Sequence, residues 1–162
     1  MSREFENRNA PTIIKVKNIH KGFDNGAIPV LKNVTLTIKE GDIAALWGSS
    51  GSGKTTLLHL MGGLDTPDSG TIDVAGLDPT AESDRLALRR QKVGFVFQLH
   101  NLIPDLTLEE NCLVTGVATG TPKSECIERF QVLAKELGID HRQDRRIQEL
   151  SGGERQRVAL CR

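Results

Sequence analysis

The strongest constraint on the fold of this chain is one glycine-rich stretch, Gly48-Ser49-Ser50-Gly51-Ser52-Gly53-Lys54-Thr55. It matches the phosphate-binding loop pattern G-x-x-x-x-G-K-[ST] at every fixed position. Small residues let successive backbone N–H groups turn inward around phosphates, while Lys54 adds a positive charge and Thr55 offers a hydroxyl to Mg²⁺. The stretch predicts a nucleoside triphosphate site, whose candidate binding residues are Gly48, Ser49, Ser50, Gly51, Ser52, Gly53, Lys54, Thr55 and Thr56.

The flanking sequence supports this prediction. Residues 43–47 form an uninterrupted apolar run, which predicts a strand buried on both faces. A helix is expected from Thr56 to Met61, ended by Gly62 and Gly63, with the positive end of its dipole aimed at the phosphates. A glycine and serine turn that matches by accident is the alternative, and the order of strand, loop and helix disfavours it.

The rest of the first half predicts mostly strands. Alternating apolar residues indicate half-buried strands over 13–18 and 34–39, separated by the turn signal Asp24-Asn25-Gly26, so the opening is antiparallel in character. A short strand is expected at 71–74 and a charged helix at 82–90. Residues 93–97 predict another buried strand, with Gln98 at its end.

Beyond Gln98 the pattern favours helices. Thr107 and Glu110 have capping-box spacing, and Thr121 followed by Pro122 predicts the start of an amphipathic helix that ends at Gly138. Ser151 and Glu154 form a second S-x-x-E pair, so a helix starts there as well. Gly152 and Gly153 keep its N-terminus open to an anion such as a terminal phosphate. Taken alone, however, S-x-x-E marks only an ordinary capped helix.

Composition argues against several classes of protein. The formal net charge is zero, which disfavours nucleic acid as the main partner. The three cysteines, Cys112, Cys126 and Cys161, are odd in number and lack C-x-x-C spacing, so reduced thiols in a cytoplasmic protein are expected. No apolar run approaches the roughly 18 residues of a membrane span, and residues 1–10 lack the apolar core of a signal peptide.

From about residue 14 to residue 162 the motifs together resemble the ATP-binding subunits of ABC transporters. GSSGSGKT is the Walker A motif, and Leu150-Ser151-Gly152-Gly153-Glu154-Arg155-Gln156 is similar to the signature motif. The resemblance implies that Phe23 is the A-loop aromatic that stacks on adenine and that Gln98 is the Q-loop glutamine, a catalytic residue and Mg²⁺ ligand beside Thr55. Taken alone, Phe23 is an apolar hairpin residue and Gln98 a polar strand end. LLHLMGGLDTPDSG and VGFVFQLHNLIPDLTLEEN are similar to the lipoprotein-releasing and macrolide-exporter type.

The resemblance implies an α/β fold, the P-loop NTPase fold of ABC ATPases, with a RecA-like core, an antiparallel β subdomain and a helical subdomain. We expect a polar lead at 1–11, the β subdomain and P-loop core at 12–98, and the helical subdomain with the signature motif at 99–162. The sequence stops at Arg162, before the family's Walker B strand, D-loop and switch histidine. The fold is therefore expected to be C-terminally incomplete and the chain catalytically incomplete, and the resemblance assigns no general base. Cys161 stands where the subfamily usually has alanine.

The implied function is ATP binding and hydrolysis coupled to export or lipoprotein release by integral membrane permease subunits. ATP and Mg²⁺ are the implied cofactors. Two copies would pair head to tail, each ATP lying between Walker A of one copy and Ser151, Gly152 and Gly153 of the other, at the inner face of the cell membrane. The alternative is a soluble ABC-type ATPase that uses ATP as a dimerisation switch. Its chromosomal members carry a long coiled coil between Gln98 and Ser151 and its ribosomal members carry tandem ATPase units, and this sequence has neither.

Overall fold

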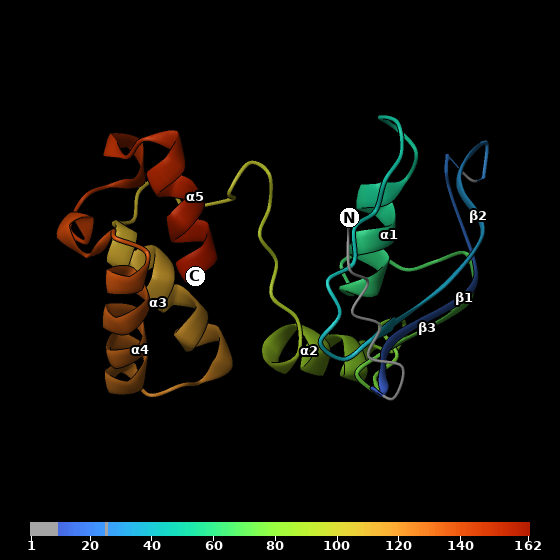
Figure 1. Cartoon of the computed structure of the whole chain (residues 1–162), viewed down its shortest axis with the longest axis horizontal. Helices are drawn as coiled ribbons and strands as arrows, with labels where there is room; N and C mark the ends of the chain where they lie inside the picture. The colour runs from blue at the N-terminus through green and yellow to red at the C-terminus, as the bar shows by residue number, and fades with distance from the viewer. Residues whose placement is uncertain (1–9, 25) are drawn as a thin grey trace, which may run out of the picture. The chain divides into compact units, whose positions relative to one another are not determined.

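The computed structural model describes residues 10–24 and 26–162. The chain divides into two compact units, residues 1–93 and residues 94–162, and each is described by itself (Figure 1). Residues 1–9 of the expected polar lead (1–11) and the centre of the turn at Asn25 lie outside the described residues. Within the described ranges, no helix has the length and apolar character needed to cross a membrane.

The first unit contains a sheet of three strands, β1 (Thr12–Phe23), β2 (Ile28–Lys39) and β3 (Ser69–Val74). The strand order is β2-β1-β3 and both pairings are antiparallel, which confirms the predicted character of the opening. The register places Val16 opposite Leu36 on one side and Ile72 on the other. Irregular pairing after Val16 lets both Val16 and Ile19 point into the core, which strict alternation along a strand would not allow.

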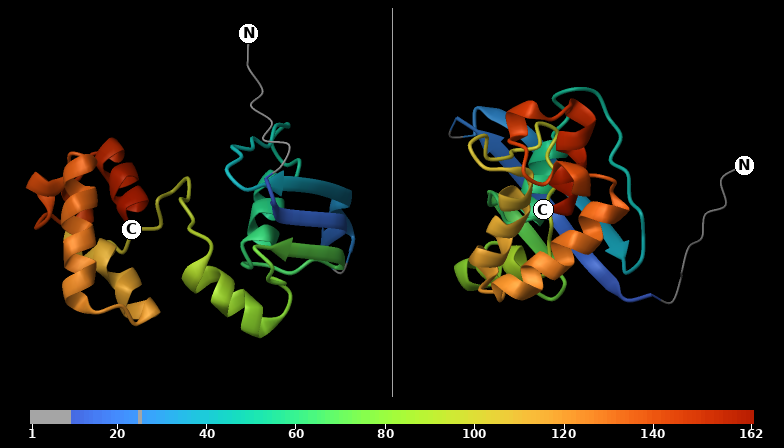
Figure 2. Two further views of the ribbon diagram at one scale, coloured as in Figure 1. Left: turned by 60° about the horizontal axis from the view of Figure 1, so that its bottom comes forward. Right: turned by 90° about the vertical axis from the view of Figure 1, so that its left-hand side faces the viewer.

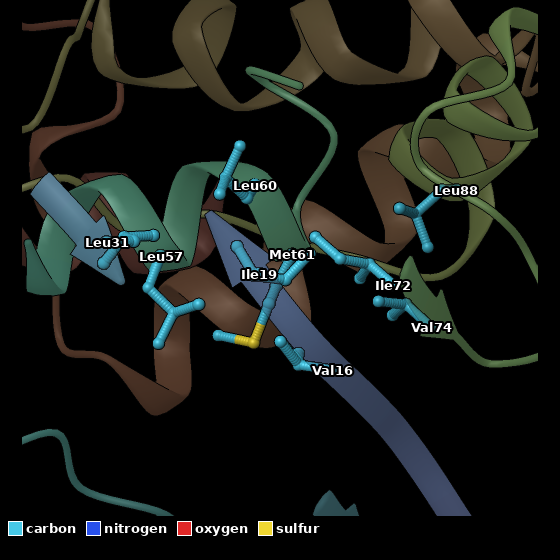
Figure 3. Packing of buried hydrophobic residues seen from close by; sticks show 9 residues of the cluster. All are labelled: Val16, Ile19, Leu31, Leu57, Leu60, Met61, Ile72, Val74 and Leu88. Carbon is cyan, nitrogen blue, oxygen red and sulfur yellow. The ribbon is translucent and has the colours of Figure 1, made fainter. Parts of the chain in front are cut away.

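Helix α1 (Lys54–Met61) covers one face of this sheet (Figure 2). Its buried side chains Leu57, Leu60 and Met61 pack with the buried residues of β1 and β3, and Met61 lies beside Val16 and Ile19 (Figure 3). Each fully buried aliphatic side chain contributes about 1.5–3 kcal/mol, so this packing holds the helix against the sheet. The predicted end of the helix is confirmed, because Gly62 N–H donates to Leu58 O and Gly63 adopts a positive φ. Helix α2 (Glu82–Gln91), where a charged helix was predicted, adds Leu88 to the same core.

The second unit is helical, with α3 (Leu108–Thr119), α4 (Lys123–Glu136), the short 3₁₀ turns η1 (Asp140–Arg142) and η2 (Ile147–Glu149), and α5 (Gly152–Cys161). The predicted capping box of Thr107 and Glu110 is confirmed. Helix α4 begins one residue later than predicted, with Pro122 rather than Thr121 as its cap. The core of this unit contains Leu108, Cys112, Phe130, Ala134, Ile139, Ile147, Leu150 and Val158.

Two predicted strands are wrong for this structure. Residues 43–47 are extended but unpaired, and Ile43 and Trp47 are 102% and 92% exposed rather than buried. Residues 93–97 likewise form no strand, although the rings of Phe95 and Phe97 stack 5.4 Å apart. The reason is physical: a parallel strand exists only through hydrogen bonds to its neighbours, and no described strand pairs with either segment.

Candidate nucleotide-binding site

The phosphate loop connects the extended segment 43–47 to α1 through glycines in the left-handed region. Gly51 has φ 78° and Gly53, the cap residue of α1, has φ 87°. A Cβ on Gly53 would lie 2.7 Å from Leu31 Cδ2 and 3.0 Å from Val30 Cγ1. Both the backbone conformation and the close approach of β2 therefore require glycine at position 53.

Lys54 folds back over the loop. Its Nζ donates to Gly48 O at 2.9 Å, to Ser49 O at 2.7 Å and to Ser52 Oγ at 3.4 Å. The ammonium group is thus held at the mouth of the loop by the carbonyls of the loop itself.

The N-terminus of α1 differs from those of α3 and α5. The cap residues Thr107 and Ser151 accept hydrogen bonds from the first turns of α3 and α5, whereas no side chain caps α1 and its first turn holds no acidic residue. Thr55, in this first turn, is exposed. Uncapped N–H groups and the positive end of the dipole favour an external anion here.

A cavity of about 200 Å³ lies beside the loop. Its lining combines Ser52, Gly53 and Lys54 with side chains of β2 and α1 and with Leu46 and Trp47. Phe23 is not among the described residues that line it.

Phe23 ends β1, opposite Ile28, and its side chain is 45% exposed. Lys21 Nζ lies 5.4 Å from the centroid of the Phe23 ring. The same ammonium donates to Asp65 Oδ1 at 2.9 Å and to Thr66 O at 2.7 Å. Partial burial would raise the pKa of Asp65, but the hydrogen bonds from Lys21 and the Thr66 N–H and the nearby positive charge hold it below its ordinary value. Lys21 thus anchors the end of β1 near the turn, and the Phe23 ring stays partly exposed.

The signature stretch forms a reciprocal capping box. Ser151 Oγ accepts from Glu154 N at 3.3 Å, while Glu154 Oε2 accepts from Ser151 N and from Ser151 Oγ, both at 2.7 Å. The serine hydroxyl, the serine N–H and the nearby Arg142 hold the pKa of Glu154 below its ordinary value. A Cβ on Gly152 would meet nothing within 4 Å, so the space beside the first turn is open.

Gln98 is exposed and begins a turn. Arg162, at the end of α5, binds the backbone of this turn. His100 and Asn101 both adopt the left-handed conformation, with φ 63° and 48°. The guanidinium of Arg162 donates to both of their carbonyls, at 3.1 Å to His100 O and 2.8 Å to Asn101 O. The sequence does not predict this role of Arg162. Its two partners lie 61 and 62 positions earlier in the chain, and contacts over such separations leave no local sequence pattern.

Asn111 is a second residue that sequence reasoning missed. It is fully buried on α3, where its Oδ1 accepts from Ile103 N at 2.8 Å and its Nδ2 donates to the carbonyls of Ile103 and Thr107 at 3.0 Å. These bonds fasten the segment after Gln98 to α3. The available signal was a polar side chain on the core-facing side of a helix, which requires buried partners.

The predicted residues are divided between the two units. Phe23 and the phosphate loop belong to the first unit, and Gln98 belongs to the second unit together with Ser151, Gly152 and Gly153.

Comparison with curated proteins identifies close relatives. The chain is 43% identical over 154 residues to the lipoprotein-releasing system ATP-binding protein LolD 1 of Rhodopirellula baltica, covering 93% of this chain and 67% of the relative. It is 43% identical over 149 residues to LolD of Aquifex aeolicus, covering 91% of this chain and 64% of that protein. The chain thus spans about two thirds of the length of these relatives.

Solved structures of ABC ATPases are also similar to this chain. The dimeric, post-hydrolysis structure of the ATP-binding cassette MJ0796 bound to ADP and Pi is 35% identical, with a TM-score of 0.82 over 91% of this chain and 67% of that one. The cbiO1 subunit of the cbiONQ ABC transporter complex from Clostridium perfringens is 28% identical, with a TM-score of 0.79 over 93% of this chain and 60% of that one. These similarities confirm the predicted α/β P-loop fold of ABC ATPases. Residues 31–162 match the family model described as "ABC transporter", and this chain belongs to that family.

Proposed function

We propose that this chain is the ATP-binding subunit of an ABC transporter that powers export or lipoprotein release. One observation carries the proposal: Lys54 is held over a loop of left-handed glycines at the uncapped N-terminus of α1. This arrangement offers N–H donors, a helix dipole and a positive charge held at the mouth of the loop to a triphosphate. The lipoprotein-releasing relatives support the choice of transport class.

The remaining site residues receive roles in this proposal. Phe23 stacks on adenine through its partly exposed ring, and the N–H groups from Gly48 to Thr56 surround the phosphates. Thr55 and Gln98 supply a hydroxyl and an amide oxygen to Mg²⁺, which suits a cation that prefers oxygen ligands and takes most of them from phosphates and water. When bound, Mg²⁺ neutralises charge that develops on the transferred phosphoryl group.

Ser151, Gly152 and Gly153 face the nucleotide of a second copy, because the first turn of α5 is open and its dipole favours a phosphate. ATP then joins two copies head to tail. The dimeric cassette structure with bound ADP and Pi supports this arrangement. Residues 12–98 would act as the β subdomain and P-loop core, and residues 99–162 as the helical subdomain.

Closure and reopening of the dimer would drive membrane permease subunits, so the chain works on the inner face of the cell membrane. Gln98 responds to the γ-phosphate. Arg162 and Asn111 would couple Gln98 to α5 and α3, because Arg162 binds the carbonyls of His100 and Asn101 and Asn111 binds the backbone of Ile103.

Titration calorimetry with Mg-ATP tests the proposal. Lys54→Ala should weaken ATP binding about 10- to 100-fold, since a hydrogen bond to a charged group contributes roughly 1.5–3 kcal/mol. Lys32→Ala, which removes an exposed lysine from β2 of the same unit, is the matched control and should bind like the wild type. Unchanged affinity in the Lys54 variant, or an equal loss in both variants, would contradict the assignment of the site.

A further inference from the structure

All three cysteines of the chain line a single cavity in the second unit. The cavity measures about 270 Å³. Cys112 comes from α3, Cys126 from α4, and Cys161 from the end of α5. Three elements that are far apart in the sequence therefore bring their thiols to one place.

Two of these thiols lie on neighbouring helices. Cys112 and Cys161 both line the cavity, and Cys112 Sγ lies 4.0 Å from Val158 O, one turn before Cys161 on α5. Helices α3 and α5 pack against each other in the core of this unit. The two cysteines thus sit on facing helices, where a short movement of the side chains would join the sulfurs.

Cys126 is arranged differently. Its Sγ lies 3.8 Å from Thr121 O, and it packs directly against Gly116, where a Cβ would overlap the sulfur. These contacts of Cys126 are with the backbone at Thr121 and Gly116. Cys126 provides an internal control, because it shares the cavity without sharing the pair.

The pair also has an order of ionisation. The neighbouring Cys112 thiol lowers the pKa of Cys161, although partial burial opposes the effect. The Cys161 thiol raises the pKa of Cys112, and burial raises it further. Cys112 is also only 8% exposed whereas Cys161 is partly exposed, so Cys161 is the thiol that an external disulfide reaches first.

We propose that Cys112 and Cys161 form a dithiol site that reacts with low-molecular-weight disulfides to give an intramolecular disulfide. The proposal is independent of nucleotide binding.

The reaction balances in two exchanges. The Cys161 thiolate attacks one sulfur of the small disulfide, whose S–S bond breaks and releases one thiolate. The thiol of Cys112 then gives its proton to solvent and attacks Cys161 Sγ, which releases the second small thiol. Two protein thiols are oxidised and one small disulfide is reduced. The product links α3 covalently to α5, the helix whose first turn carries the signature glycines.

The test uses the reduced 162-residue chain and oxidised glutathione as the probe. After incubation, remaining thiols are alkylated and the chain is digested with trypsin without reduction. Cleavage after lysine and arginine places Cys112 in 93–123, Cys126 in 124–129 and Cys161 in 158–162. We expect peptide 158–162 linked to 93–123, while 124–129 carries an alkyl group or glutathione. Dithiothreitol should reverse the link.

Two variants and a denatured sample test whether the link is specific to Cys112 and Cys161 of the folded chain. Cys126→Ala should form the same link, and Cys161→Ala should form none. Oxidation in concentrated urea should lose the preference for Cys161 and Cys112, because the folded contact creates it. Separate glutathione adducts on Cys112 and Cys161 of the folded wild type, or a link that includes 124–129, would overturn the proposal whether or not a variant folds.

Discussion

Replacing Gly53 by alanine tests the packing that positions the phosphate loop. The new Cβ would lie 2.7 Å from Leu31 Cδ2 and 3.0 Å from Val30 Cγ1, and φ at this position is +87°. Gly51→Ala is the matched control, since its φ is +78° and a Cβ there meets nothing within 4 Å. A left-handed alanine costs about 1–2 kcal/mol, which is offset in part by about 0.4–1 kcal/mol of lost chain entropy in the unfolded state. Gly51→Ala should therefore destabilise the chain by about 1 kcal/mol.

Gly53→Ala carries the same backbone cost and adds overpacking against a buried leucine, about 1–3 kcal/mol, for a total of about 2–4 kcal/mol. Urea unfolding followed by circular dichroism measures the difference. The extra cost of about 1–3 kcal/mol should lower the midpoint of Gly53→Ala by about 0.3–3 M relative to Gly51→Ala if the slope stays near 1–3 kcal/mol/M. Equal midpoints for the two variants would refute the claim that β2 closes on the loop at Gly53.

Two further predictions concern Phe23 and Glu154. Phe23→Ala should weaken ATP by about 1–2 kcal/mol, the loss of one aromatic stack, while Phe23→Tyr is nearly silent; an equal loss for inorganic triphosphate would rule out adenine stacking. Because the pKa of Glu154 is lowered in the folded chain, its contribution to stability is complete above its ordinary value of 4.5 and is lost as the pH falls through the lower folded value. Glu154→Gln should remove this part of the acid dependence in urea unfolding between neutral and acidic pH, and an unchanged profile would show that Glu154 has an ordinary pKa.

Features set by neighbouring residues could be predicted from the sequence. The capping boxes at Thr107 and Ser151 join residues three positions apart, and both form as expected. The glycines that end α1 also act locally, through their own backbone conformation. The antiparallel pairing of β1 with β2 followed from two alternating segments joined by a short turn.

Features that depend on distant partners could not be predicted in this way. Apolar composition indicated buried strands at 43–47 and 93–97, but a strand also needs neighbours, and composition does not supply them. For the same reason the sequence did not predict the contact of Arg162 with the turn after Gln98 or the shared cavity of Cys112 and Cys161. Each joins residues from separate elements, so only the fold brings them together.

The most direct test of the proposed function is the assembly state of the protein with and without Mg-ATP, for the wild type and for Ser151→Arg. Ser151 caps α5 and is exposed, so arginine at this position should leave ATP binding by each copy nearly intact while it blocks the approach of a second copy's nucleotide. Size-exclusion chromatography under conditions that prevent hydrolysis should show ATP-dependent dimers of the wild type and monomers of the variant. ATP-dependent dimers of Ser151→Arg at wild-type affinity would contradict the account.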